Sequence, residues 1–289
     1  RSTPLYSSAA SDVYKRQSED NPDWKAAEIV CQALDLEHHQ HVLEGNAFNQ
    51  SLPSLSWHGE DLDITVLFFQ PLFSTMSQSV KVGLCGQGAD ELHAGYPRYK
   101  DLSSHRLSIN SRLDACEHPF ANRLREGKIV GNGWSGDHNP STVFSNLNST
   151  LDYEMNHGQL TNFQLRLVDR HSMAHGLEVR VPFLGQPHVS ASSGLPLDWK
   201  LSPEVEKAAL RAAADLTRLP KEIVNRPKLP AGRATSPTMI ENLLDELHGH
   251  ALQYANDFPQ LAGMFKDQPE ISLGLRLFRS LHITDGGVG

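Results

Sequence analysis

The sequence predicts an α/β protein in which a parallel sheet is followed by a largely helical region. A helix is predicted directly after the Asn21-Pro22 start signal, because four apolar residues follow at the i, i+3, i+4 and i+7 spacing of one helix face: Ala27, Val30, Cys31 and Leu34. A strand is predicted over residues 80–85, where a β-rich run meets a glycine-rich turn. Helical spacing returns from Leu160 onward.

Shorter patterns predict the remaining elements. Residues 38–43 (HHQHVL) predict a short strand, and residues 64–76 predict a buried helix kinked at Pro71. Residues 204–217 predict a helix, and Ser236-Pro237 caps another whose apolar residues fall on one face: Ile240, Leu243, Leu244 and Leu247. Residues 100–150 are polar and irregular, so no element is assigned there and a boundary is expected.

Composition favours a globular protein that acts on small molecules. The chain has 289 residues, 39% of them apolar and 21% charged, which is enough to build a core and far from the composition of disordered chains. Its formal net charge is −8, and no run of Lys and Arg is longer than two residues. A nucleic-acid partner is therefore excluded, because neutralising phosphates along a duplex needs a basic face.

The sequence also limits the compartment. No apolar stretch approaches the length of a membrane span, and no segment has the order of charged, apolar and small residues found in a signal peptide. The three cysteines have no CxxC spacing, which favours a reducing compartment over a disulfide framework or a zinc site. We therefore expect a cytoplasmic protein that does not enter a membrane.

The domain organisation begins with a segment that we set aside. Residues 1–17 change character abruptly at Gln17 and look like translated adapter sequence, a non-native leader. Residues 18–289 are then treated as one domain, with a sheet-bearing part at 18–100 and a mostly helical part at 150–289.

The turn GQGADE at residues 86–91 is the first candidate for chemistry. Parallel sheets bind ligands just beyond the carboxyl ends of their strands, where glycines let backbone amides approach phosphate or ribose. Asp90 would then be placed to hold magnesium, and Asp90→Asn is expected to leave stability nearly unchanged because the cleft is expected to be solvated. The alternative is a tight turn in which Asp90 caps the following helix.

Two further segments carry dense charge. Residues 169–180 contain Asp169, Arg170, Glu178 and Arg180 beside apolar positions, which indicates either site residues or ion pairs holding a helix to a loop. The segment NRPKLPAGRATS contains Lys228 in a loop rich in proline and glycine, which indicates either an anion site or a solvated basic loop. The histidines in HHQH lack a carboxylate or cysteine at ligand spacing, so a zinc site is not predicted there.

Together these segments resemble the synthetase domain of glutamine-hydrolysing asparagine synthetases. That family's pattern runs close to SGEGADELFGGYPRY, then DRxSMAHxLEVRVPFLD, then an LPxEIxxRPK loop. The corresponding segments here are CGQGADELHAGYPRY at 85–99, DRHSMAHGLEVRVPFLG at 169–185 and LPKEIVNRPK at 219–228. The three motifs stand in the family's order, and the resemblance extends over roughly residues 20–250.

The resemblance implies a fold and a reaction. The fold would be an adenine nucleotide alpha hydrolase-like, Rossmann-like parallel sheet, of which residues 18–100 form a part. The side-chain carboxylate of aspartate would attack the α-phosphate of ATP, releasing pyrophosphate and leaving a mixed anhydride that ammonia opens. ATP and Mg²⁺ would be the cofactors, and a glutaminase domain upstream would supply the ammonia from glutamine; a homodimer is one assembly that we consider.

The resemblance also assigns roles to residues of this chain. Eight positions carry over, although Cys85 stands where the pattern has Ser and Gln87 where it has Glu: Cys85, Gly86 and Gly88 beside AMP, Asp90 on Mg²⁺, and Gln87, Asp169, Arg170 and Lys228 as catalytic residues. Lys228 would neutralise the pyrophosphate as charge builds on it, while Asp169 and Arg170 would shape the aspartate side of the cleft. Gln87 stands where the family often has Glu; an amide cannot act as a base, so only a hydrogen-bonding role is carried over.

One family feature is absent from this sequence, namely the SGGxDS pyrophosphate loop expected before residue 18. Contacts to charged phosphate contribute about 1.5 to 3 kcal/mol each, so a chain without them is expected to bind ATP poorly and to be inactive alone. Two alternatives stay open. One is a relative with another acyl substrate, such as a β-lactam synthetase-like enzyme or a modified-peptide amidotransferase; the other is a non-catalytic scaffold.

Overall fold

The computed structural model of this chain describes residues 5–6, 22–39, 45–126, 137–228 and 244–284. Its strands are parallel but short. β1 (Leu5–Tyr6) pairs with β2 (His38–His39), and β3 (Val82–Leu84) pairs with β4 (Glu178–Arg180). The α/β class and the parallel pairing are confirmed, whereas a wide Rossmann-like sheet stays a prediction.

β1 belongs to the segment 1–17 that the sequence led us to set aside, and the rest of that segment lies outside the described residues. Helix α1 (Pro22–Leu34) begins at the predicted proline, and Cys31 is its buried residue. The predicted strand at 38–43 is described only as far as His39, where β2 ends.

The main core forms around three helices of the first half and the middle. They are α2 (Gly45–Gly59), α3 (Phe69–Ser77) and α9 (Leu165–Met173), and their shared core includes Ile64, Leu67, Phe68, Leu72, Leu167 and Leu177. The predicted buried helix is confirmed over residues 69–76, but its start at residue 64 and its kink at Pro71 are wrong. A 3₁₀ turn, η2 (Ile64–Val66), precedes α3, and Pro71 falls in the first turn of α3, where a missing N–H costs no helical hydrogen bond.

Residues 100–150 were left unassigned from the sequence, and their described part contains several helices. η3 (Pro97–Lys100) leads to α5 (Leu102–Asp114), α6 (Pro119–Arg125), α7 (Pro140–Val143) and α8 (Leu147–Asn156). Side chains cap their first turns: Asp101 accepts from Ser104 N–H at 2.9 Å and Asn146 from Ser149 N–H at 3.0 Å. These helices lack a strong apolar stripe, and α5 buries none of its residues, which explains why spacing did not reveal them.

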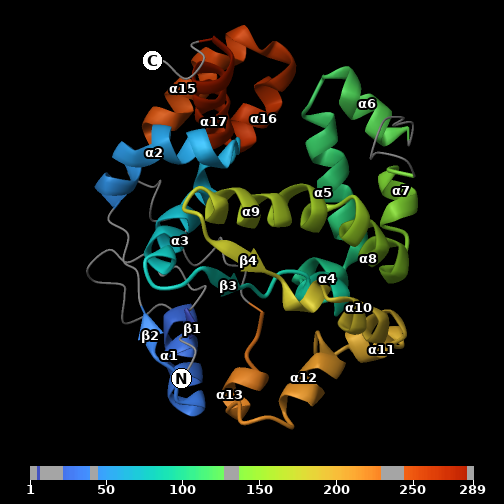
Figure 1. Cartoon of the computed structure of the whole chain (residues 1–289). Helices are drawn as coiled ribbons and strands as arrows, with labels where there is room; N and C mark the ends of the chain where they lie inside the picture. Colours follow the sequence, from blue (N-terminus) through green and yellow to red (C-terminus); the bar gives the residue numbers. More distant parts are fainter. Residues whose placement is uncertain (1–4, 7–21, 40–44, 127–136, 229–243, 285–289) are drawn as a thin grey trace.

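The chain then crosses the molecule and returns to the sheet. A π-helical turn, η4 (Leu160–Gln164), runs into α9, which lies beside β3 and β4 (Figure 1). After β4 come η5 (Pro182–Leu184), α10 (Gln186–Ser193), α11 (Leu197–Lys200), α12 (Ala208–Ala214) and α13 (Lys221–Val224). The helix predicted at 204–217 is thus shorter than expected, because Lys207 has a left-handed backbone that delays its start.

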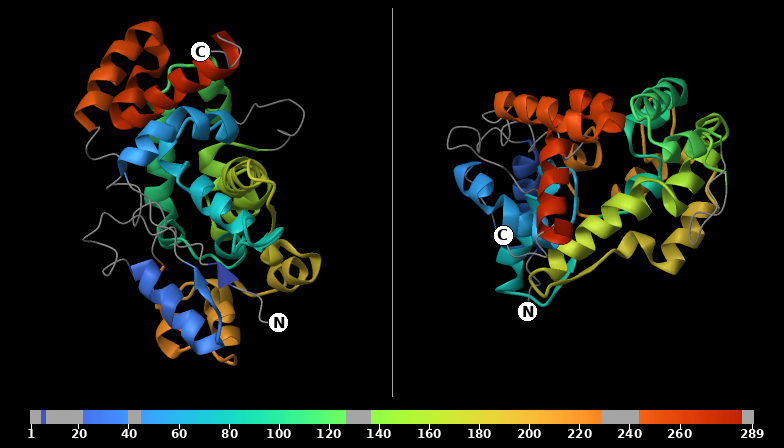
Figure 2. Two further views of the ribbon diagram at one scale, coloured as in Figure 1. Left: turned by 60° about the vertical axis from the view of Figure 1, so that its left-hand side comes forward. Right: turned by 90° about the horizontal axis from the view of Figure 1, so that it is seen from above.

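The C-terminal helices form a group of their own at one end of the molecule. They are α15 (Leu244–Asp257), η7 (Pro259–Leu261), α16 (Ala262–Asp267), α17 (Pro269–Arg279) and the π-helical η8 (Ser280–Thr284), and they lie next to α2 (Figure 1). At the opposite end, α1 lies beside α13 (Figures 1 and 2). The predicted start of a helix at Ser236-Pro237 lies outside the described residues. No helix among the described residues combines the length and apolar character needed to cross a bilayer.

Candidate functional site

The loop after β3 has the geometry that its glycines predict. Cys85 N–H donates to the Arg180 carbonyl at 2.8 Å, so the β3–β4 ladder continues to the start of the loop. Gly88 has φ +91°, and an added Cβ there would overlap Leu184, so the chain can turn here only with glycine. At Gly86 an added Cβ would meet nothing within 4 Å, so the loop faces open space at this point.

Asp90 is the centre of the site. It lies in the first turn of α4 (Ala89–Leu92), and its two carboxylate oxygens accept hydrogen bonds from Lys207 Nζ at 3.0 Å and from Lys228 Nζ at 2.8 Å. Burial by itself would raise the pKa of Asp90, but the two ammonium groups outweigh it and hold that pKa below its usual range. The three residues Asp90, Lys207 and Lys228 are called the strand-end site below.

Two expectations about Asp90 are wrong. Its side chain is 14% exposed, so it does not lie in a solvated cleft. It also does not cap a helix, because the N-cap of α4 is Gly88 and no side chain bonds to that helix start. The close approach of Gly95 explains how the site is packed: an added Cβ at Gly95 would overlap Asp90 Oδ1 and lie 2.9 Å from Lys207 Cδ.

Lys207 is the site residue that sequence reasoning missed. It precedes α12 with φ +56°, a left-handed conformation that is uncommon for a lysine. Its sequence neighbourhood, EVEKAALRAAA, indicates only a helix rich in alanine, and nothing in the spacing links it to Asp90. The signal that could have identified Lys207 is a lysine near the start of a predicted helix, in a sequence that also contains the GQGADE loop at residues 86–91.

Cys85 and Gln87, also predicted for the site, lie in the loop that precedes Asp90. Gln87 is half-buried, and so is Cys85. Burial raises the pKa of the Cys85 thiol, so the neutral form is favoured and the residue is not an activated nucleophile. The ring centre of Tyr96 lies 5.4 Å from Lys228 Nζ, so the ammonium that pairs with Asp90 also makes a cation–π contact.

A buried polar network supports the loop from behind. Arg98 lies over the rings of Tyr96 and Tyr99, at 4.0 and 5.0 Å, and its guanidinium donates to Glu154 at 3.0 Å. Glu91, the neighbour of Asp90, is fully buried here, and this burial raises its pKa. The two adjacent carboxyl groups thus have opposite pKa shifts: Asp90 is held ionised by lysines, whereas Glu91 is pushed toward its neutral form.

The structure does not bring Arg170 to the strand-end site. On α9 its guanidinium is 2.9 Å from Glu60, which follows α2, and Arg166 makes a similar pair with the buried Asp61 at 2.7 Å. Asp169 is exposed on the same helix. The ion-pair interpretation of this segment therefore describes Arg170, which joins α9 to the end of α2.

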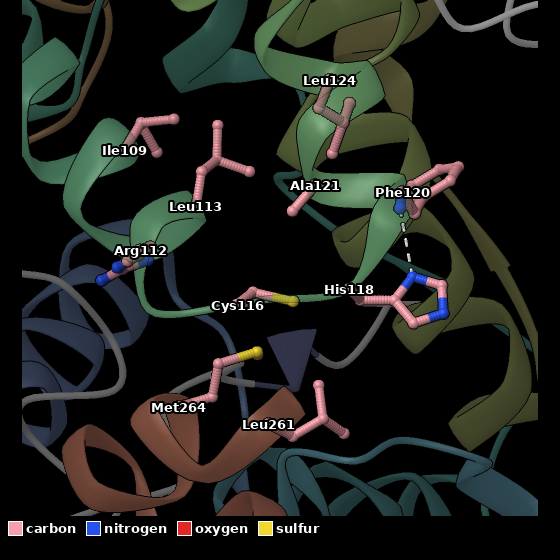
Figure 3. A pocket seen from close by; sticks show the side chains of 10 residues that line it. All are labelled: Ile109, Arg112, Leu113, Cys116, His118, Phe120, Ala121, Leu124, Leu261 and Met264. Carbon is pink, nitrogen blue, oxygen red and sulfur yellow. Dashed lines mark hydrogen bonds between the residues drawn. The ribbon is translucent and has the colours of Figure 1, made fainter. Parts of the chain in front are cut away.

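An apolar pocket of about 450 Å³ lies elsewhere, between the α5–α6 turn and the start of α16 (Figure 3). Cys116 and Met264 face each other across it, and His118 stands at its edge, where its ring accepts from Phe120 N–H at 3.2 Å. None of the predicted site residues lines it. Within the described ranges, no group of three or more His, Cys, Asp and Glu side chains could hold a metal ion.

Comparison with known proteins decides the family. The family model described as asparagine synthase matches residues 5–267, which is most of the chain. This chain belongs to the asparagine synthase family. The resemblance given by the three motifs is thereby confirmed, and the match begins inside the segment 1–17.

Curated relatives are similar at modest identity. The asparagine synthetase [glutamine-hydrolyzing] of Rattus norvegicus is 28% identical over 218 residues, covering 73% of this chain and 32% of the relative. The asparagine synthetase [glutamine-hydrolyzing] 1 of Bacillus subtilis is 25% identical over 246 residues, covering 70% and 39%. The chain thus matches about a third of the length of these asparagine synthetases.

Proposed function

We propose that this chain carries the ATP-dependent, amide-forming site of an asparagine synthetase, with Asp90, Lys207 and Lys228 at its polyphosphate end. The observation that carries the proposal is the pairing of one carboxylate with two ammonium groups beyond the carboxyl end of β3. Family membership supports a role in asparagine biosynthesis. Aspartate, ATP and glutamine-derived ammonia as substrates are part of the proposal.

The charge of the site favours an anionic ligand. Two lysines and one aspartate leave a net charge of about +1 at the end of a parallel strand, where such sheets bind phosphates. A triphosphate can replace the Asp90 carboxylate as the partner of both ammonium groups, and each such contact contributes about 1.5 to 3 kcal/mol. The open space at Gly86 leaves room for the nucleotide beside the loop.

Lys228 and Lys207 would stabilise the pyrophosphate as its charge builds during adenylation of aspartate. In the proposal Gly86, Gly88 and Cys85 line the AMP moiety. Gln87 donates and accepts hydrogen bonds there but takes no proton.

Mg²⁺ fits the site only together with phosphate. Asp90 is the single carboxylate of the strand-end site and both its oxygens are paired with lysines, so this site by itself offers no metal centre. Mg²⁺ commonly takes one or two carboxylates and completes its shell with phosphate oxygens and water. Asp90 would therefore hold Mg²⁺ once phosphate draws the lysines away, and the bound ion would neutralise phosphate charge.

Of the two residues predicted to shape the aspartate side of the cleft, we keep one in the proposal. Asp169 remains a candidate there because it is exposed, whereas we do not extend the proposal to Arg170, whose guanidinium is paired with Glu60. A glutaminase domain, a homodimer and a cytoplasmic location belong to the proposal for the full-length protein. The chain as given contains no SGGxDS sequence, and we propose that it binds Mg-ATP weakly and makes no asparagine alone.

The test measures AMP, pyrophosphate and asparagine formed by the full-length protein from ATP, aspartate and either ammonia or glutamine. The expected result is formation of all three, lost in Lys228→Ala and kept in Lys221→Ala. Lys221 is the control because it is exposed and pairs with Asp215, outside the strand-end site. AMP without asparagine would favour another acyl substrate. No AMP under any condition would favour a non-catalytic scaffold. Calorimetric titration of the chain as given with Mg-ATP tests its expected weak binding; micromolar affinity would contradict it.

A further inference from the structure

Arg211 lies directly behind Lys228 and bonds to the segment that carries it. The guanidinium, on α12, is 12% exposed. Its Nε donates to the Glu206 carbonyl at 2.9 Å, and its Nη2 donates to Glu206 Oε1 at 2.6 Å. Nη2 also donates to the Arg226 carbonyl at 2.8 Å, and Nη1 donates to the Val224 carbonyl. The Arg211 side chain therefore bonds to two backbone carbonyls, those of Val224 and Arg226, in the segment that precedes Lys228.

Glu206 completes the arrangement. Its Oε1 accepts from Arg211 and also from the backbone N–H of Lys228 at 3.3 Å, while Lys100 Nζ lies 3.6 Å from its Oε2. Burial acts to raise the pKa of Glu206, but hydrogen bonds to its backbone and to Arg211 outweigh it, so its pKa is lowered and the carboxylate is ionised. Glu206 thus joins the Arg211 guanidinium to the main chain of Lys228.

The segment between α13 and Lys228 depends on these contacts. α13 ends at Val224, and the N–H groups of Asn225 and Arg226 still donate to carbonyls of that helix, at 2.9 and 3.2 Å. Pro227 has no N–H to donate, so the helix itself does not hold the chain beyond Arg226. The Val224 and Arg226 carbonyls and the Lys228 N–H bond to Arg211 and Glu206. The Arg226 side chain also pairs with Asp23 on α1, but the contact to the Lys228 main chain itself comes from Glu206, which Arg211 holds in place.

We propose that Arg211, together with Glu206, is a positioning residue that fixes the Lys228 segment so that the Lys228 ammonium reaches the strand-end site. A planar guanidinium can serve two carbonyls and a carboxylate at once, whereas the single ammonium of a lysine cannot. The role of Arg211 and Glu206 in placing Lys228 does not depend on the proposed function. Its consequence for polyphosphate binding does rest on the proposed function.

The first test measures placement without any ligand. Amines are labelled with a trace of an acylating reagent, and the rate at Lys228 is read by mass spectrometry relative to Lys221, whose side chain is 73% exposed. Arg211→Lys should raise the relative rate at Lys228 about tenfold, because the ammonium is freed from Asp90. The control Arg218→Lys changes an exposed arginine of the same region and should leave the rate unchanged. An unchanged rate in a folded Arg211→Lys protein would overturn the proposal.

The second test uses inorganic pyrophosphate as the probe, titrated into the full-length protein in a double-mutant cycle. Arg211→Lys should weaken affinity about tenfold, and combining it with Lys228→Ala should weaken affinity no further than Lys228→Ala alone. Additive losses would show that Arg211 acts on stability or on the ligand directly and would overturn the proposal. Absence of pyrophosphate binding in the unmodified protein would reject the proposed function, and the labelling test would still decide on Arg211.

Should Arg211→Lys fail to fold, Glu206→Gln provides the second variant. It keeps an acceptor for the Lys228 N–H but removes the charge that holds the guanidinium. A smaller rise in Lys228 labelling, about threefold, is expected from it, since a neutral partner makes roughly half the hydrogen-bond energy of a charged one. No rise at all would overturn the shared role of Glu206 and Arg211.

Discussion

The strand-end site and the α9 ion pairs use the same chemical groups in different proportions. In the strand-end site two ammonium groups share the single carboxylate of Asp90. At α9 each cation has its own carboxylate: Arg166 pairs with Asp61 and Arg170 with Glu60. The α9 pairs are balanced and lie between two packed elements, so they fasten α9 to the end of α2. The strand-end site has a cation in excess, which suits it to receive an anion.

The largest effect is expected from breaking the turn that supports the strand-end site. Gly88→Ala places a Cβ at φ +91° and against Leu184, so strain and overpacking together should lower the free energy of unfolding by about 3 kcal/mol. Gly176→Ala, just after α9, is the matched control. Its φ is +64° but an added Cβ meets nothing within 4 Å, so about 1 kcal/mol is expected. Equal losses in urea denaturation would show that overlap with Leu184 does not matter.

A pH effect of similar size should come from His93, three residues after Asp90. Burial, followed by the charges of His188, Lys200 and Lys207, lowers the pKa of His93 to about 4, against an ordinary value of about 6.5. The unfolded chain therefore binds the proton first, and stability should fall as pH drops from 6.5 to 4, by on the order of 3 kcal/mol.

His93→Phe, which keeps an aromatic ring, isolates this effect. Burial also lowers the pKa of His171 on α9, to about 3. Protonation of His171 should therefore lower the stability of both proteins at still lower pH. The difference in stability between the variant and the wild type should grow as pH falls from 6.5 to 4 and then level off. A constant difference would mean that His93 is protonated in the folded protein.

Asp90→Asn sharpens the comparison because its two effects separate. Stability should fall by about 2 kcal/mol, since two half-buried ammonium groups lose their counter-charge. Without Mg²⁺, pyrophosphate should bind about tenfold more tightly, because the resident competitor for Lys207 and Lys228 is weakened. With Mg²⁺ it should bind more weakly than to the unmodified protein. A loss under both conditions would mean that Asp90 does not compete with the ligand.

The smallest effect is expected at α9. Arg170→Ala removes a partly exposed ion pair with Glu60, and such pairs contribute about 0 to 1 kcal/mol. Melting temperature should change little, and the apparent KM for aspartate of the full-length protein should stay the same. A raised KM for aspartate with unchanged stability would restore the substrate role that the family resemblance assigned to Arg170.

The sequence allowed the local parts of the site to be predicted and left the distant ones hidden. The β3 strand and its glycine loop follow from residues 80–91 alone, and α1 follows from its proline and apolar spacing. The resemblance carried by the three motifs assigned Lys228 and Asp90 to the same ATP site. In the structure Lys228 Nζ donates to Asp90 Oδ2. These predictions rest on short-range patterns or on resemblance.

Other features depend on tertiary contacts that no local pattern encodes. Lys207 reaches Asp90 across 117 residues of sequence. Arg211 contacts carbonyls, which carry no sequence signal at all. Arg170 was assigned to the site although it pairs with Glu60, because a high density of charged residues in a segment does not reveal the partner of each side chain. The helices of residues 100–150 were missed because capping residues, rather than an apolar stripe, mark their starts.

The left-handed backbone of Lys207 has a consequence for engineering this protein. A lysine at φ +56° is disfavoured relative to glycine, so replacing it with Gly relieves backbone strain on the order of 1 kcal/mol. The same replacement removes the ion pair between Lys207 and Asp90, which offsets the gain from the relaxed backbone. Position 207 is a point of trade-off, where conformational preference and the demand for a second cation oppose each other.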